Sequence, residues 1–223
     1  KPYAEYYLFR VSGEGIVTHE EHNFIVTNDM RYDVTVVRTV TDIDGNVYRT
    51  VKIGDQWWMA ENLKVTHYSN GDPIPIEPDP HKWVNMKYSK TGAYCAYDND
   101  TTNIEVYGLL YNWYAVASSR NLAPEGWHTP SDAEYKELEM TLGLSRHEAD
   151  SWYHRGTNEG GKLKSTGNLT DGTGLWLKPN VGATNSCGFC ALPTGVRADD
   201  GKFLWIGKCA CFWTTSGNKL DGY

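Results

Sequence analysis

Four of the five cysteines crowd into residues 187–211, and they are the densest group of reactive side chains in this 223-residue chain. They form a C-x2-C pair at Cys187 and Cys190 and a C-x-C pair at Cys209 and Cys211. Zinc is one interpretation, but C-x-C is a poor half-site for a tetrahedral centre. Free buried thiols are another. We expect cross-strand disulfides with pairing left open, because residues 189–196 and 210–215 read as neighbouring antiparallel strands.

A histidine, a hydroxyl and a carboxylate follow closely at His128, Ser131 and Asp132, which is the set of groups that a catalytic triad needs. Ser131 also begins a capping box with Glu134, however, and a hydroxyl committed to a helix cap is a poor nucleophile. No G-x-S-x-G, H-E-x-x-H or phosphate-loop motif occurs in the sequence. We therefore expect a structural histidine, no catalytic residue and no enzymatic activity.

Carboxylates raise the question of calcium. Glu77-Pro78-Asp79 is faintly similar to the tripeptide with which C-type lectins bind calcium and sugar together, although it lies before both predicted helices. Asp98 and Asp100 could join Asp79 in a calcium loop, but they lack the ligand spacing of an EF-hand. We expect turns here, with no metal site and no cofactor, and calcium is the one ion left open.

The elements that would position these groups are short. Residues 1–40 read as alternating strands over 5–13, 15–26 and 31–40. The turn residues Asp44-Gly45-Asn46 predict a β-hairpin that follows. Residues 65–100 read as an irregular stretch, because prolines at 73, 75, 78 and 80 argue against a helix or a central strand.

Two helices are predicted further along the chain. An apolar stripe predicts the first over residues 108–118, and the capping box predicts a second that begins at Ser131, with Gly143 as a plausible end. After residue 160 we expect short strands, with a hairpin turn at residues 198–201. The predicted fold class is α+β, with two helices, a small and mostly antiparallel sheet and long loops.

Composition limits the classes of partner that this chain can bind. The net charge is −7 and no run of Lys or Arg occurs, which argues against nucleic-acid binding. No stretch reaches the length of an apolar membrane span. The 15 Tyr and 9 Trp fit either a loop-rich core with half-exposed aromatic rings or a ligand surface. A chain that begins at Lys1 carries no signal peptide at its start, so we expect a mature or trimmed protein.

An ordered series of aromatic and glycine blocks runs through the chain: "DGNVYRTVKIGDQWWMAENLK", "YGLLYNWYA", "GWHTPSDAEY", "GGKLK" and "GFCALPTGVR". This series resembles the Fibrobacter succinogenes major paralogous domain, a family of bacterial secreted and cell-surface proteins, over about residues 41–216. The family is similar to C-type lectin-like domains, so the resemblance implies that fold for residues 41–223. Residues 1–40 would be a β appendage or the end of a preceding β domain.

The resemblance also implies a closing strand, approximately G-F-x-V-R-C, whose cysteine could pair with Cys95. No such strand occurs before the last residue, Tyr223.

In the related folds, loops after the second helix carry the ligand surface, and fold alone does not say which ligand. The candidate ligand-binding residues here are Trp152, Trp176, Asn180, Arg197, Asp199, Asp200, Phe203 and Trp205. Indole faces stack on sugar rings or on flat protein surfaces, and the polar side chains would fix the orientation. Trp176 and Trp205 are the preferred anchors; the alternative is that they fill a loop-rich core.

The leading hypothesis is a non-catalytic recognition or adhesion module of a bacterial surface protein, for instance a lipoprotein, which binds a glycan or a host or cell-surface protein. The expected disulfides and the resemblance would place it outside the cytoplasm, in the medium or at the cell surface. The alternative is a structural domain of a fimbria-like appendage, docked through residues 1–40 to a neighbouring β domain or subunit. The third hypothesis is a cleft enzyme related to formylglycine-generating enzymes, with Cys209 or Cys211 reduced and exposed.

Overall fold

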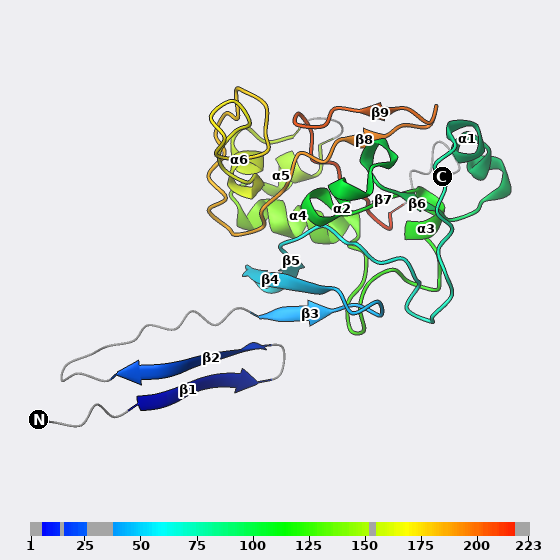
Figure 1. The fold of residues 1–223 in the computed structure, drawn as a ribbon. Coiled ribbons are helices and arrows are strands. Elements are labelled where there is room, and N and C mark those ends of the chain that lie inside the picture. Colours follow the sequence, from blue (N-terminus) through cyan, green and yellow to red (C-terminus); the bar gives the residue numbers. More distant parts are fainter. Residues whose placement is uncertain (1–5, 14–15, 26–37, 152–154, 217–223) are drawn as a thin grey trace, which may run out of the picture.

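The chain folds as a mixture of short helices and small antiparallel sheets, which confirms the α+β class (Figure 1). The computed structural model describes residues 6–13, 16–25, 38–151 and 155–216. The strands are β1 (Tyr6–Gly13), β2 (Ile16–Ile25), β3 (Thr39–Thr41), β4 (Val47–Ile53), β5 (Gln56–Met59), β6 (Tyr94–Cys95), β7 (Leu110–Tyr111), β8 (Val196–Arg197) and β9 (Phe203–Leu204). The α-helices are α1 (Pro80–Ser89), α2 (Ile104–Tyr107), α3 (Trp113–Val116), α4 (Asp132–Thr141), α5 (Arg146–Ala149) and α6 (Glu159–Leu163).

The first two strands pair with each other in an antiparallel sheet, as the alternating pattern of the N-terminal stretch predicts. The predicted strand at 31–40 falls mostly outside the described residues, and its end coincides with the start of β3. The next sheet has the order β3-β4-β5, and its first hairpin turns at Gly45, whose φ of +86° suits glycine. This confirms the predicted hairpin.

The stretch predicted to be irregular contains a regular helix, α1. Asp79 caps it by accepting hydrogen bonds from the amides of His81 and Lys82, and Pro80 occupies its first turn. A proline is tolerated there because the first amides of a helix have no partner within the helix. The prediction failed because it treated every proline as a helix breaker, whatever its position.

The predicted helix over residues 108–118 is wrong for most of its length. Leu110 and Tyr111 pair with β6, and only the four residues of α3 are helical. Asn112 begins α3 as its cap and also accepts a hydrogen bond from the amide of Ala93. Pairing with a distant strand has overridden the local apolar periodicity.

The second predicted helix is confirmed as α4. The Ser131 hydroxyl accepts from the amide of Glu134, and the Glu134 carboxylate accepts from the amide of Ser131, which completes the capping box. The hairpin of β8 and β9 around residues 198–201 is also confirmed. The other predicted strands after residue 160 are absent from the described part of the chain, apart from an isolated bridge between Lys164 and Ala191.

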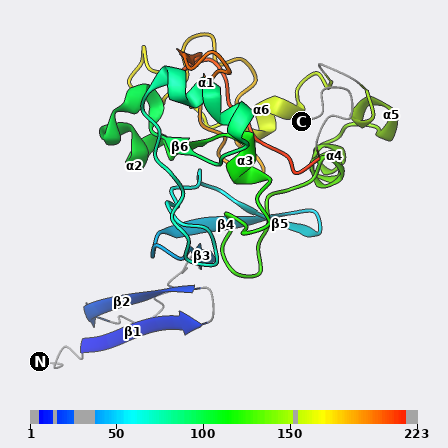
Figure 2. The same ribbon diagram turned by 90° about the vertical axis from the view of Figure 1, so that its right-hand side faces the viewer.

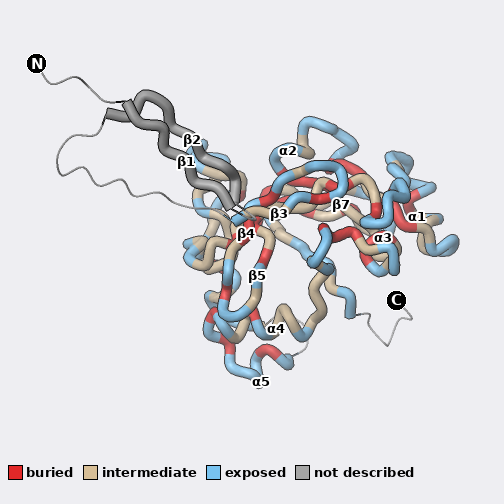
Figure 3. Tube along the Cα trace, turned by 90° about the horizontal axis from the view of Figure 1, so that it is seen from below, coloured by how far each residue is buried: buried red, intermediate tan, exposed pale blue. Residues whose placement is uncertain are grey.

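Three apolar clusters form the core, each beside a different helix. The first packs α4 against β4 and β5 around Leu138, which is fully buried. The second surrounds α3, and the third joins Trp83 of α1 to Cys95 of β6. Figure 2 shows α1–α3 and α4–α5 as separate groups beside the β4–β5 hairpin. Figure 3 shows buried segments in both of these groups. None of the described helices has the length and apolar character needed to cross a membrane.

Candidate functional site: an aromatic groove

A groove of about 900 Å³ runs between parts of the chain that are far apart in sequence. Its walls come from β5 and β7, from the loop before α4, from residues 189–199 and from the C-terminal segment 211–213. Ligand sites for small molecules usually span roughly 300–1,000 Å³, so the groove lies near the upper end of that range. Its size makes it the principal candidate site of the described residues.

Exposed indoles are the most prominent feature of this lining. Trp57, Trp205 and Trp213 are 41%, 55% and 49% exposed and come from three different segments. Strand alternation explains the exposure of Trp57, because neighbouring side chains of β5 point to opposite faces. Trp58 therefore turns inward and packs on Tyr135, with 5.1 Å between ring centroids.

The backbone at Trp205 is unusual. Its φ of +66° lies in the left-handed region, which is costly for a bulky aromatic residue. The surrounding chain holds it there, since the amides of Lys208 and Cys209 both donate to its carbonyl oxygen. Its indole forms no hydrogen bond with any other described residue. A strained, exposed tryptophan at the wall of a groove is a stronger site candidate than its sequence context alone could show.

The C-terminal segment brings Trp213 into the groove. Its Nε1 donates to the carbonyl oxygen of Tyr111 at 2.7 Å, and its ring packs on Trp113 with 5.8 Å between centroids. Phe212 meets Phe189 edge-on at 5.4 Å. Neither Trp57 nor Trp213 was among the sequence candidates. The alternation of side chains along β5 could have indicated from the sequence that Trp57 is exposed. No sequence pattern indicates the long-range contact of Trp213.

Most charged groups of the lining have partners within the protein. Glu61 pairs with Arg49 at 2.7 Å, and His128 pairs with Glu134 at the same distance. Burial raises the pKa of Glu134, but hydrogen bonds from the Ser131 amide, the His128 ring and the Ser131 hydroxyl outweigh it, so the pKa lies below its ordinary value.

Arg197 lines the groove but is buried and structurally committed. Its guanidinium donates to the carbonyl oxygens of Glu77, Pro78 and Gly201. It also lies between aromatic rings, 4.3 Å from the Trp83 centroid and 5.0 Å from that of Phe203. The structure thus gives this sequence candidate the role of fastening the β8–β9 hairpin to the start of α1.

The other sequence candidates do not form one site. Trp205 and Asp199 line the groove beside Arg197, whereas Asp200 pairs with Lys202 at 2.7 Å in solvent. Phe203 packs on Tyr97, with 5.2 Å between centroids. Trp152 lies outside the described residues.

The second preferred anchor, Trp176, is buried rather than displayed. It lines a smaller cavity of about 550 Å³, and its Nε1 donates to the Ser165 hydroxyl at 3.0 Å. Lys164 sits over its ring at 4.3 Å, and burial lowers the pKa of that lysine. Asn180 is tied to the same loop, because its amide donates to the carbonyl oxygens of Ser165 and Gly167. These contacts favour the core-filling alternative for Trp176.

The cysteines form no disulfide: all five are free thiols. The expected cross-strand bonds fail because residues 189–195 are not a strand, and Cys190 has a φ of +59°. The Cys187 thiol donates instead to the Lys162 carbonyl oxygen at 3.2 Å. Burial, followed by contact with the Cys209 thiol, raises the pKa of Cys211 to about 12. Burial also raises the pKa of Cys95.

The triad geometry is not present. The Ser131 hydroxyl donates to Glu134 at 2.8 Å, and His128 contacts the other oxygen of the same carboxylate. Serine and histidine therefore share a carboxylate, whereas a triad needs the histidine between serine and acid. The expectation of a structural histidine fits this arrangement.

The carboxylates proposed for calcium act as helix caps. Asp79 caps α1, and Asp100 accepts from the amide of Thr102 at the start of a 3-10 turn. Within the part of the chain that the structure describes, no three acidic, histidine or cysteine side chains are grouped to hold a metal.

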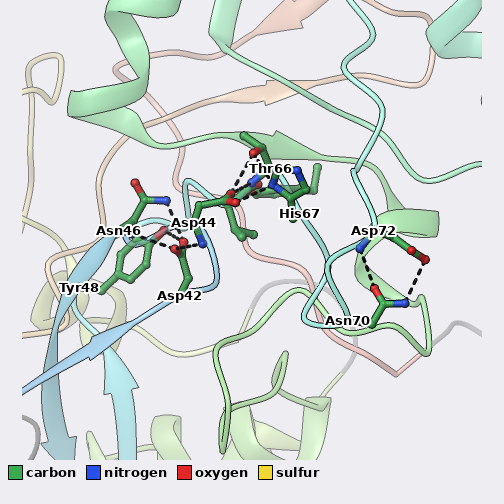
Figure 4. A network of polar contacts seen from close by, with 10 residues as sticks. Asp42, Asp44, Asn46, Tyr48, Thr66, His67, Asn70 and Asp72 are labelled. Carbon is green, nitrogen blue, oxygen red and sulfur yellow. Dashed lines mark hydrogen bonds and ion pairs between the residues drawn. The ribbon is translucent and has the colours of Figure 1, made fainter.

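A second carboxylate cluster lies at the β3–β4 hairpin and is fully engaged (Figure 4). Asp42 accepts hydrogen bonds from the amides of Asp44 and Asn46 and from the hydroxyl of Tyr48, the last at 2.6 Å. Asp44 in turn accepts from the amide and hydroxyl of Thr66 and contacts the His67 ring at 2.6 Å. With its oxygens satisfied internally, this cluster stabilises the turn rather than offering a site.

Comparison with known proteins identifies the class of this chain. Residues 51–222 match the family model of the Fibrobacter succinogenes major domain. Since the match covers most of the sequence, the chain belongs to this family of bacterial domains. No curated protein and no solved structure is similar enough to count as a match.

Proposed function

We propose that this domain is a non-catalytic recognition module with a C-type lectin-like arrangement, displayed outside the cytoplasm, which binds a glycan or a protein in the aromatic groove. The observation that carries the proposal is the exposure of Trp57, Trp205 and Trp213 on the walls of one 900 Å³ groove. Large aromatic side chains with one apolar face and one polar edge are the usual anchors of such sites.

The chemistry of the groove favours binding over catalysis. Ser131 and Glu134 are occupied by the helix cap, and Arg197 by main-chain carbonyls. Cys211 lines the groove as a free thiol, which is the location that the enzyme hypothesis requires. Its partial burial and its contact with the Cys209 thiol raise its pKa, however, which disfavours the thiolate, and the thiolate is the nucleophilic form.

A screen against immobilised glycans and surface proteins, run with and without calcium, tests the proposal. Trp205→Ala should abolish the signal while the circular dichroism spectrum is unchanged. Tyr88→Ala is the matched control, because Tyr88 is 74% exposed on α1 and lies away from the groove. Equal binding by wild type and Trp205→Ala would refute the groove as the recognition surface.

An assembly role is the second candidate, and it rests on a different observation. The sheet of β1 and β2 has two strands, and both outer edges lack a partner strand among the described residues. Open edges pair readily with other chains. Light scattering across a concentration series, together with amide exchange, tests this role: self-association that protects the amides of β1 or β2 would support it, and a monomer at all concentrations would oppose it.

A further inference from the structure

The charge state of the groove restricts what it can bind. Glu61 and Glu134 are paired with Arg49 and His128, and the Arg197 guanidinium is buried against carbonyl oxygens. An acidic ligand needs cations whose hydrogen bonds are free, because charge-assisted contacts supply most of its recognition. None of these groups offers one, and the whole lining has three carboxylates (Glu61, Glu134 and Asp199) against two arginines (Arg38 and Arg197), so it carries no net positive charge to attract an anion.

Two charged side chains of the lining remain, and they differ in what they offer. Arg38 is exposed and stacks over Trp57, with its Cζ 4.5 Å from the ring centroid, so its guanidinium covers one face of that indole. Asp199 is exposed in the turn of the β8–β9 hairpin and forms no ion pair with another described residue. A free carboxylate accepts hydrogen bonds from hydroxyl groups and repels anions.

The remaining contacts are apolar faces. Trp205 presents an indole that no described hydrogen bond engages, and Trp57 stays 41% exposed with Arg38 over one face. A pyranose ring offers a flat face of C–H groups to such surfaces. Hydroxyl donors on the ring edge match the carboxylate of Asp199. Indole faces with a free acceptor therefore complement a neutral sugar in both shape and charge.

The dimensions of the β8–β9 hairpin favour an oligosaccharide over a single sugar ring. Trp205 directly follows β9, and Asp199 lies in the turn at the other end of the hairpin, with Arg197 opposite Phe203 in register. At about 3.3 Å per residue, the three steps from Gly195 through β8 to Ala198, where the turn begins, span roughly 10 Å. We infer that, within the proposed recognition role, the groove ligand is an uncharged linear oligosaccharide that stacks on Trp205 and Trp57 and donates hydroxyl hydrogen bonds to Asp199.

Titration calorimetry with length-matched hexasaccharides tests the inference. The probes are neutral hexamers of glucose, xylose and mannose, the corresponding disaccharides, and hexagalacturonate as the anionic counterpart. We expect one neutral hexamer to bind at least about tenfold more tightly than its disaccharide, with little change between low and high salt. Trp205→Ala should weaken binding by about tenfold or more, and Asp199→Asn by severalfold, whereas Tyr88→Ala should have no effect.

The outcomes separate this inference from the broader proposal. Tighter binding of hexagalacturonate, or Trp205-dependent binding of a protein or peptide from a display library, would overturn the neutral-sugar inference and leave the recognition role standing. A blank result with all hexamers would also overturn it. If neither the glycan screen nor the display library yields a ligand whose binding needs Trp205, the recognition role fails as well.

Discussion

The guanidinium of Arg197 lies over the indole ring of Trp83, with its Cζ 4.3 Å from the ring centroid. This contact joins β8 to α1 across more than half the sequence, and hydrogen bonds to the carbonyl oxygens of Glu77 and Pro78 reinforce it. The residue was a ligand candidate in the sequence because its polar side chain could fix the orientation of a ligand. Because it is buried, it instead holds the β8–β9 hairpin against the start of α1 and so stabilises this wall of the groove.

Arg197→Met should therefore lower stability. Three carbonyl oxygens lose a charged donor, and hydrogen bonds to charged groups contribute about 1.5–3 kcal/mol each, so we expect a loss of roughly 2–4 kcal/mol after relaxation. Urea unfolding followed by tryptophan fluorescence measures the change. Lys202→Met on the same hairpin is the control, because that side chain is exposed and should shift stability by less than about 0.5 kcal/mol. Unchanged stability of Arg197→Met would contradict the fastening role.

The hydroxyl of Tyr48 makes a second set of buried hydrogen bonds that should stabilise the fold. It donates to Asp42 at 2.6 Å and accepts from the Lys64 amide at 2.9 Å, and the side chain is fully buried. Tyr48→Phe leaves both groups short of a partner and should cost about 1–3 kcal/mol of unfolding free energy. Tyr88→Phe, at an exposed position, should change the same thermal or urea transition by a few tenths of a kcal/mol at most. Equal effects of the two substitutions would argue against the network in Figure 4.

Stability should fall in acid because of Glu134. Its pKa in the folded protein lies below the ordinary 4.5, so the unfolded chain binds a proton more readily than the folded one. The contribution of this carboxylate is full above pH 4.5 and is lost as the pH falls through the folded pKa. Glu134→Gln removes the titration, and its plot of unfolding free energy against pH should be flatter below pH 4.5 than that of wild type. If the two plots had the same slope below pH 4.5, proton binding by Glu134 would not be linked to unfolding.

Local signals in the sequence predicted the elements whose chemistry is contained within a few residues. The Asp44-Gly45-Asn46 turn, the Ser131–Glu134 capping box and the hairpin at residues 198–201 were all confirmed. Asp42 accepts from the amides of Asp44 and Asn46 in the first turn, and Ser131 and Glu134 bond each other's amides in the capping box, so these signals act within four residues.

Features that depend on distant contacts were missed. The helix expected at residues 108–118 is interrupted because β7 pairs with β6, and α1 forms despite the surrounding prolines. The groove is harder still to predict, because Trp57 and Trp213 come to line it only after the chain has folded. Sequence spacing cannot show that Trp176 is buried while Trp205 is exposed.

The free thiols lead to a direct chemical prediction. Alkylation of the unfolded protein without a reductant should modify all five cysteines, since none is in a disulfide. In the native protein Cys95 should react last because it is buried, and the rate at Cys211 should rise with pH through the alkaline range because its pKa is about 12. Peptide mass mapping after timed labelling measures both. Fewer than five labels on the unfolded chain would reveal a disulfide and revive the original pairing hypothesis.

The backbone at Trp205 permits a test that separates strain from contact. At an ordinary position alanine is more stable than glycine, but at a φ of +66° glycine avoids the steric cost of a Cβ. We expect Trp205→Gly to be more stable than Trp205→Ala by about 1 kcal/mol, although both remove the same indole. The order should reverse at Tyr88 in α1, where alanine should exceed glycine by about 1 kcal/mol. Both Trp205 variants should lose ligand binding equally, because the missing indole is common to them. If alanine were the more stable at both positions, the left-handed backbone at Trp205 would not be a property of the folded protein, and the strain could not be assigned to ligand recognition.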